Sequence, residues 1–213
     1  MSEGKKFEVR KTPKKRFEIS HEGGGRRFEV RGESQNTPLT WHQQKNASDC
    51  GPCMILNVLQ QMPGVRHAPG TVQEIRRDVN RLRREANMTE LGPLGWFRSD
   101  DIGEYLSKIA GLNVEEFACT AETAQEDLRA IQQSIAQRPF EFVYSTAGQH
   151  FRAVVPSENG YELFDSLNAG PERAPAESVN EMAAQVVTAT SQARLERFGI
   201  VRQGEATYTT RAR

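Results

Sequence analysis

Helical and strand patterns occupy different parts of this sequence, and this separation limits the possible fold more than any other feature. Between residues 50 and 137 apolar side chains recur at the three- and four-residue spacing of helices, and between residues 140 and 201 short apolar runs alternate with turn residues. Parallel sheets need helices and strands to alternate, whereas helices followed by strands indicate an α+β domain. We therefore expect an N-terminal helical part packed on an antiparallel sheet.

The first predicted helix begins near Cys50 and is apolar around most of its surface until Pro63 ends it. A helix that is apolar all round lies inside its domain, so this one is expected at the centre of the fold. Thr71 and Glu74 then have the spacing of a capping box, which predicts the start of a second helix. We interpret its arginine-rich run, residues 76–84, as a face in contact with solvent.

Two further helices and a set of strands complete the expected domain. Ser99 and Thr123 are the predicted N-caps, and Gly111 is the predicted left-handed end of the helix that follows Ser99. Residues 158–160 read Glu-Asn-Gly, a turn that predicts antiparallel pairing of the strands on either side. The expected strands cover residues 140–145, 151–155, 161–164 and 198–201, with a helix over residues 175–188.

Residues 1–37 repeat a basic pair followed by Phe-Glu and a β-branched residue, at residues 5–9, 15–19 and 26–30. This segment has few other large apolar groups, so it buries too little surface to offset the entropy of ordering, and we expect a disordered tail. Each copy of the repeat can add a strand to the sheet of a protein partner that the sequence does not identify. Residues 38–203 are expected to form one domain and residues 204–213 a C-terminal tail.

The formal net charge is zero, but the charges are divided between two parts of the chain. The first 32 residues carry ten Lys or Arg and five Glu, which leaves 18 basic and 23 acidic residues in the other 181. A domain of this sign lacks the basic surface that phosphates require, so nucleic acid is not an expected partner. No apolar run is long enough to cross a membrane, and the lysine-rich start lacks the apolar core of a secretory signal. We expect a cytoplasmic protein, or one delivered into a host cell if the organism is a pathogen.

Three cysteines, an odd number, favour a reducing compartment and a chemical role for a thiol. Cys50-Gly51-Pro52-Cys53 spells the dithiol motif of thioredoxin-like oxidoreductases. Those enzymes place the motif directly after a buried strand, whereas residues 43–49 contain no apolar run. The dithiol interpretation is therefore kept as an alternative. Otherwise Cys53 is expected in the core and Cys119 at the end of a strand.

Cys50 is also a candidate nucleophile, because a thiol at a helix N-terminus beside an imidazolium has a pKa of about 3.5 to 7.5. His150 is the candidate base, and Asp165, fifteen residues later on the paired strand, is the candidate residue that orients its ring. Gln44 and the Cys50 backbone N–H are candidate donors to an oxyanion. His42 is a rival base, but no carboxylate on a paired strand would orient it. No metal or cofactor is expected, since the cysteines and histidines lack ligand spacing.

This set of residues resembles the papain-like cysteine proteases, and most closely the Josephin group of deubiquitinases. The matching segments are Gln44, Asp49-Cys50-Gly51, residues 57–60, residues 95–97, His150, Asp165-Ser166-Leu167 and residues 168–172, in that order. The resemblance covers about residues 40 to 203. It implies a papain-like fold in which the central helix carries the cysteine, with residues 38–203 as the catalytic domain and residues 65–95 as a mobile helical arm.

The resemblance also implies an activity, which is cleavage after a Gly-Gly tail through a thioester on Cys50. The implied substrate is ubiquitin, a ubiquitin-like protein or a peptide that contains Gly-Gly. The implied roles are nucleophile for Cys50, general base for His150, orienting residue for Asp165, oxyanion donor for Gln44, and walls of a narrow glycine channel for Trp96 and Phe151.

Two features differ from the Josephin pattern and leave alternatives open. The third member of the Josephin triad is typically Asn, whereas Asp165 and the string of residues 44–51 are more similar to Ulp-type SUMO proteases and to double-glycine leader peptidases. A leader peptidase or an acyltransferase on the same fold is therefore an alternative to a deubiquitinase. A thioredoxin-like oxidoreductase using Cys50 and Cys53, and a module that binds a modifier without turnover, are the further alternatives.

Overall fold

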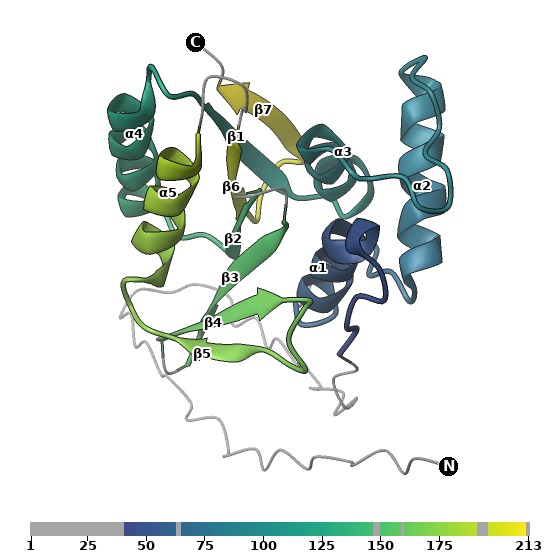
Figure 1. The fold of residues 1–213 in the computed structure, drawn as a ribbon, viewed down its shortest axis with the longest axis horizontal. Helices are drawn as coiled ribbons and strands as arrows, with labels where there is room; N and C mark the ends of the chain where they lie inside the picture. Colours follow the sequence, from purple (N-terminus) through teal and green to yellow (C-terminus); the bar gives the residue numbers. More distant parts are fainter. Residues whose placement is uncertain (1–40, 63–64, 147–149, 159, 191–195, 212–213) are drawn as a thin grey trace, which may run out of the picture. The chain divides into compact units, whose positions relative to one another are not determined.

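A seven-stranded sheet forms the middle of the structure (Figure 1), a computed structural model that describes residues 41–62, 65–146, 150–158, 160–190 and 196–211. The strand order is β5-β4-β3-β2-β6-β1-β7, and every neighbouring pair is antiparallel except β1 and β7. The strands are β1 Asn113–Cys119, β2 Phe142–Ser145, β3 Arg152–Ser157, β4 Gly160–Asp165, β5 Glu172–Ala174, β6 Glu196–Arg202 and β7 Thr207–Arg211. The repeats of the first 37 residues lie outside the described residues.

Helices cover both faces of this sheet. On one face lie α1 (Cys50–Leu59), α2 (Val72–Glu85) and α3 (Ser99–Glu104), the last continued by a π-helical turn, η2 (Tyr105–Ile109). On the other face lie α4 (Ala124–Gln137) and α5 (Ser178–Ala189). No helix in the described part of the chain is long and apolar enough to cross a membrane. The expected α+β architecture is confirmed.

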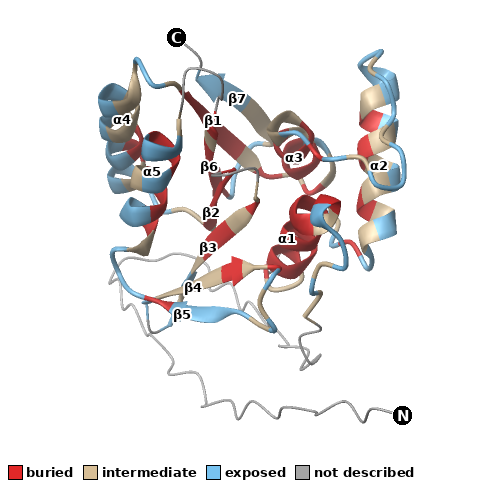
Figure 2. Ribbon diagram, in the orientation of Figure 1, coloured by how far each residue is buried: buried red, intermediate tan, exposed pale blue. Residues whose placement is uncertain are grey.

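The helix α1 is the centre of the first layer. All ten of its residues are buried, which Figure 2 shows as a continuous buried ribbon between the sheet and α2. Because α1 contacts β3 and β4 on one side and α2 on the other, it has no solvent-facing side. The expected central helix is therefore present, and its first residue is Cys50.

Alternation along β1 shows why the sheet has two cores. Val114 belongs to the core under α1 and α3, whereas Phe117 and Cys119 belong to the core under α4 and α5. Successive side chains of a strand point to opposite faces, so both faces of β1 are buried. Its two central glutamates, Glu115 and Glu116, are also buried and bond partners on opposite faces of the sheet.

Several local expectations are confirmed and one is wrong. Thr71 caps α2, accepting a hydrogen bond from the Glu74 N–H at 3.1 Å, and Gly111 has the predicted left-handed backbone, with φ of +78°. Ser99 is not a cap, because the Asp101 carboxylate accepts from the Arg98 N–H and makes Arg98 the N-cap.

The C-terminal residues differ most from expectation. Residues 204–213 were expected to be a tail, but Thr207–Arg211 form β7, which pairs in parallel with β1. The strand begins three residues after Gly204, whose φ of +134° allows the chain to reverse after β6. The threonine-rich residues Thr207–Arg211 therefore form the edge strand of the sheet instead of a free tail.

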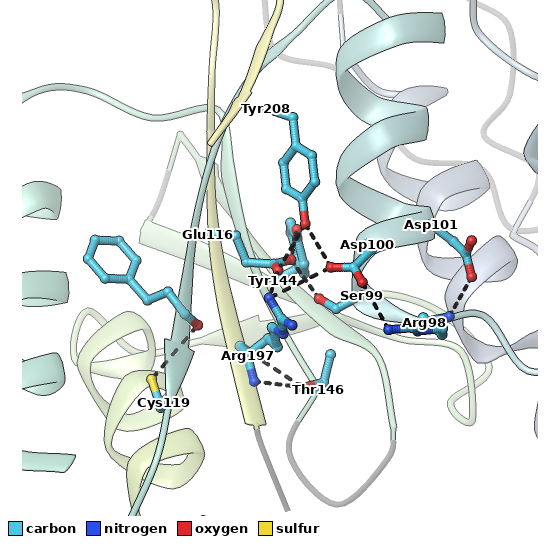
Figure 3. A network of polar contacts seen from close by, with 11 residues as sticks. Arg98, Ser99, Asp100, Asp101, Glu116, Cys119, Tyr144, Thr146, Arg197 and Tyr208 are labelled. Atoms are coloured by element: carbon cyan, nitrogen blue, oxygen red, sulfur yellow. Dashed lines mark hydrogen bonds and ion pairs between the residues drawn. The ribbon is translucent and has the colours of Figure 1, made fainter. Parts of the chain in front are cut away.

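One buried carboxylate joins five elements of the fold (Figure 3). Glu116, fully buried in β1, accepts hydrogen bonds from Ser99 Oγ at 2.6 Å, Tyr144 Oη at 2.7 Å and Tyr208 Oη at 3.1 Å. Arg197 Nη1 lies 2.9 Å away and balances the charge. A buried carboxylate is stable only when it is paired and hydrogen-bonded, so this network fixes α3, β2, β6 and β7 around β1.

Gly199 makes room for this network, and its substitution is the first testable prediction. A Cβ at position 199 would lie 2.1 Å from the Tyr144 ring. Gly199→Ala is expected to push Tyr144 away from Glu116 and lower the free energy of unfolding by about 1 to 3 kcal/mol, the usual range for overpacking. Urea unfolding of both proteins measures the difference.

The matched control is Gly170→Ala, since nothing lies within 4 Å of a Cβ at that position. It should leave the urea midpoint within experimental error. Equal midpoints for the two variants would contradict the proposed packing of Tyr144 against Gly199.

Candidate active site

Cys50 lies at the start of the buried helix. A 3-10 turn, Ala47–Asp49, leads directly into α1, and Cys50 is its first residue with an exposed fraction of 3%. The first backbone N–H groups of a helix have no partner within the helix, and the helix dipole favours negative charge there. The chain therefore places its thiol at the positive end of the helix dipole.

His150 and Asp165 meet at one end of the β3–β4 pair. Arg152 pairs with Asp165 in the sheet, so His150 lies two residues before the paired position. Its Nε2 atom lies 2.7 Å from Asp165 Oδ1. The same carboxylate oxygen accepts the Leu167 N–H at 3.0 Å, so the backbone fixes the residue that holds the imidazole.

The His150 ring also interacts with the thiol. The pKa of His150 is raised above its ordinary value by a side-chain hydrogen bond with Cys50 and, to a lesser degree, by the hydrogen bond and charge of Asp165, while burial acts in the opposite direction. Because Nε2 is engaged by Asp165, Nδ1 is the ring nitrogen that remains for the thiol. The structure thus brings together three of the residues singled out in the sequence, and their catalytic roles remain predictions.

Gln44 is held by the residue after Asp165. Ser166 Oγ donates to Gln44 Oε1 at 2.6 Å, and the Gln44 N–H donates to the Ser166 carbonyl at 3.0 Å. Ser166 is 1% exposed, so this contact is protected from water. With its oxygen occupied, the amide of Gln44 presents its nitrogen as the free donor side, apart from a long 3.4 Å contact with the Asn46 carbonyl.

The segment before Cys50 runs along the loop after β4. Trp41 Nε1 donates to the Asn168 carbonyl and Gln43 Nε2 to the Leu167 carbonyl, each at 2.8 Å. Together with the Gln44–Ser166 pair, these bonds attach the chain that leads to the thiol to the loop that carries the carboxylate. The sequence contained no signal for this pairing, because neither segment has strand periodicity.

The two predicted channel walls have different environments. Trp96 is 52% exposed, as a substrate contact requires, and it is one of the exposed large apolar residues together with Leu94 and Leu167. Phe151 is 5% exposed, and its role as a wall of a narrow glycine channel stays a prediction. A Cβ on Gly51 would lie 3.2 Å from the Phe151 ring, so Phe151 packs against the first turn of α1.

The other two thiols and His42 have surroundings that differ from those of Cys50 and His150. Cys53 is 2% exposed and burial, followed by the charge of Asp49, raises its pKa to about 12. Burial also raises the pKa of Cys119 to about 12, and this residue ends β1 as expected. His42 Nε2 faces the Gln60 amide at 3.4 Å, its backbone bonds Asn57, and burial lowers its pKa.

Among the described residues no group of three or more His, Cys, Asp or Glu side chains is arranged to hold a metal ion. The groups that the structure does bring together are the thiol of Cys50, the imidazole of His150 and the carboxylate of Asp165.

Arg76 is a part of the site that the sequence interpretation missed. Its guanidinium Nη2 lies 2.8 Å from Asp49 Oδ1, and its side chain is 13% exposed. The arginine-rich run was interpreted as a solvent-facing surface, which is wrong for Arg76 and also for Arg83, paired with Asp101 at 2.8 Å. Arg76 and Arg83 are seven residues apart, which places both on the inner face of α2. This spacing is visible in the sequence.

Comparison with known proteins adds little to this picture. No protein-family model matches the chain, and no curated protein matches it. Among solved structures, the chain is similar to the crystal structure of UfSP from C. elegans, with a TM-score of 0.46 and 12% sequence identity. The match covers 78% of this chain and 33% of that chain, so this chain spans about a third of the length of that protein. The site is therefore interpreted from its own geometry.

Titration of the histidines tests the geometry without assuming an activity. The ring of His150 is expected to titrate above pH 6.5, and Cys50→Ala and Asp165→Asn should each lower this value, because each removes an interaction that favours the imidazolium. Histidine side-chain NMR signals recorded against pH measure the pKa directly.

His42 provides an internal control in the same spectra, because burial lowers its pKa and neither substitution touches it. A His150 pKa that stays constant in both variants would show that the ring does not contact the thiol and the carboxylate.

Proposed function

We propose that this protein is a papain-like cysteine protease that releases ubiquitin or a ubiquitin-like modifier after its C-terminal Gly-Gly. The observation that carries the proposal is the meeting of three groups: Asp165 Oδ1 lies 2.7 Å from His150 Nε2, and the Cys50 thiol, at the N-terminus of a buried helix, is the main cause of the raised pKa of His150. A thiol, an imidazole and a carboxylate in this order are the components of nucleophilic catalysis. The ubiquitin-like substrate and the Josephin-type relationship come from the resemblance of the sequence motifs.

The first half of the reaction forms an acyl-enzyme. The Cys50 thiolate attacks the carbonyl carbon of the terminal glycine, and a carbon–sulfur bond forms. The tetrahedral intermediate then collapses, the carbon–nitrogen bond breaks, and the His150 imidazolium gives its proton to the leaving amine. Asp165 keeps the ring oriented and stabilises its positive charge, a role that fits the 2.7 Å contact with Nε2.

The second half restores the enzyme. Neutral His150 accepts a proton from water, the hydroxyl adds to the thioester, and the carbon–sulfur bond breaks to release the modifier with a free carboxyl group. The thiolate and the imidazolium are then both regenerated. A free thiol is needed throughout, which a reducing compartment such as the cytoplasm maintains.

Two donors are proposed to stabilise the oxyanion. The Cys50 backbone N–H, in the first residue of α1, is one of them. The Gln44 side chain is the second, because Ser166 occupies its oxygen and leaves the nitrogen to donate. A donor that is already oriented stabilises the charge that develops on the oxygen, because it does not have to reorient when the tetrahedral intermediate forms.

The dithiol alternative is not favoured by the surroundings of Cys53. In an exchange reaction the second thiol must become a thiolate to resolve the mixed disulfide. Burial and the Asp49 charge oppose this by raising the pKa of Cys53 to about 12.

Covalent capture is the test of the proposed activity. The protein is incubated with ubiquitin and, separately, with ubiquitin-like modifiers, each carrying an electrophile in place of the terminal carboxylate, and the products are examined by intact mass. We expect one modifier to add once, on Cys50, and Cys50→Ala to remain folded without forming an adduct.

Cys53→Ser is the matched control, one helical turn away, and should form the adduct at the rate of the unmutated protein. Absence of an adduct with every modifier would remove the substrate claim. A loss of reactivity in Cys53→Ser equal to that in Cys50→Ala would favour the dithiol chemistry instead.

The pH dependence of turnover gives a further prediction. The imidazolium is needed to protonate the leaving amine, so kcat/KM should fall as the pH rises through the pKa of His150. That pKa is raised, chiefly by Cys50 and then by Asp165, so the alkaline limb should lie above pH 6.5.

Asp165→Asn should move this limb to lower pH by about one unit or more and reduce kcat/KM about 100-fold. The measurement is the hydrolysis rate of the captured modifier's C-terminal fluorogenic amide between pH 5 and about pH 10. An unchanged alkaline limb in Asp165→Asn would show that the carboxylate does not act on His150.

A further inference from the structure

We propose that Arg76 is a positioning residue that joins the turn before Cys50 to the loop that carries Trp96, an inference that rests on the proposed function for its effect on substrate. The first segment is the 3-10 turn Ala47–Asp49, which precedes α1, and the second is the loop that precedes α3. A single guanidinium on α2 bonds both. Arg76 therefore joins the nucleophile's turn to the Trp96 loop, in addition to the packing of Phe97 beside Gly51, where a Cβ on Gly51 would lie 3.3 Å from the Phe97 side chain.

The first contact of Arg76 is with the turn that leads into α1. Its Nη2 atom donates to Asp49 Oδ1 at 2.8 Å and to the Ser48 carbonyl at 2.9 Å. Ser48 is buried, and the side chains of Arg76 and Asp49 are each 13% exposed. An ion pair shielded in this way is held more firmly than one on the surface, because water and salt compete less for its atoms.

The second contact is with the two residues on either side of Trp96, the backbone of Gly95 and the ring of Phe97. Nη1 donates to the Gly95 carbonyl at 3.0 Å, and the guanidinium carbon lies 5.3 Å from the centre of the Phe97 ring. Trp96, the residue between them, is the exposed one. A planar guanidinium can bond in its plane and stack on an aromatic face at once, which a lysine ammonium cannot do.

The Gly95 turn is tight enough for such a bond to fix it. The Gly95 N–H donates to the Gly92 carbonyl at 2.9 Å, and a Cβ at Gly95 would lie 2.9 Å from the Leu91 side chain. The turn is closed on one side by its own backbone and on the other by Arg76. Trp96 is therefore presented from a backbone held at two points.

Attachment of α2 to the domain does not depend on Arg76. The helix buries Ile75, Val79 and Leu82 against the core. Two turns after Arg76, Arg83 forms a second buried ion pair with both oxygens of Asp101, at 2.8 and 3.0 Å. Because α2 is held by these contacts, the distinct effect of Arg76 falls on the turn before Cys50 and on the Trp96 loop. Within residues 65–95, expected to be a mobile arm, α2 is thus packed on the core, and the mobility of the arm stays a prediction.

Three variants separate positioning from stability. Arg76→Lys keeps the charge opposite Asp49 but cannot also bond Gly95 and stack on Phe97. Arg76→Gln loses the charge as well. Arg83→Gln is the matched control, since it breaks an equally buried ion pair of the same helix; the partners of Arg83 are Asp101 and the Thr89 carbonyl, seven residues before Trp96.

The first measurement is independent of any substrate. In a Trp41→Phe background, acrylamide quenching of the remaining tryptophan reports the exposure of Trp96. We expect the quenching constant to rise about 1.5-fold in Arg76→Lys and Arg76→Gln, because the loop loses one of its two attachments, and to stay unchanged in Arg83→Gln.

The second measurement is inactivation of Cys50 by a tetrapeptide that ends in Gly-Gly with a C-terminal vinyl methyl ester, compared with inactivation by iodoacetamide. For Arg76→Lys we expect the concentration for half-maximal inactivation by the peptide to rise about 10- to 100-fold while the iodoacetamide rate changes less than about twofold. Arg83→Gln should leave both values unchanged.

Unaltered quenching and peptide inactivation in Arg76→Lys would overturn the inference, as would the same changes in Arg83→Gln. Failure of the proposed function has a different signature. The peptide would then not inactivate the unmutated protein, while the quenching result would still decide whether Arg76 holds the Trp96 loop.

Discussion

The packing of one buried helix on the ends of two paired strands is the constraint on which the site depends. α1 lies on β3 and β4, and its first turn meets the point where His150 precedes β3 and Asp165 ends β4. The β3–β4 register brings the imidazole to the carboxylate, and the burial of α1 brings the thiol to the imidazole. A shift of one residue in that register would turn the side chains of β4 to the opposite face and separate the pair.

The first turn of α1 is held from two directions besides the sheet. The segment of residues 41–44 bonds the loop after β4, and Ser166 orients the Gln44 amide at the same time. From the other side, Arg76 of α2 bonds Asp49 and the loop around Trp96. Preorganised groups of this kind lower the free energy of activation, because their orientation is already fixed in the folded protein. The reacting groups lie close together, but their positions are determined by three separate parts of the fold: the β3–β4 pair, residues 41–44 and α2.

Much of this arrangement follows from the sequence, and the remainder has physical causes that sequence patterns do not carry. The apolar run after Cys50 predicted α1, and the Glu-Asn-Gly turn predicted the strand pair that carries His150 and Asp165. β1 has two glutamates at its centre and so lacks the apolar pattern of a strand, and only its end at Cys119 was expected. The charge of Glu116 is neutralised by a residue distant in the sequence, Arg197. β7 is rich in threonine and is stabilised by its pairing with β1. Arg76 looked like part of a solvated surface because its partner Asp49 is 27 residues away in the sequence.

The most direct measurement of the central claim is the rate at which iodoacetamide alkylates each cysteine at pH 6, followed by peptide mass mapping. If Cys50 forms a thiolate paired with the His150 imidazolium, Cys50 should react at least about tenfold faster than Cys53 and Cys119, and His150→Ala should remove the difference. An alkylation rate at Cys50 that does not change in folded His150→Ala would contradict the account.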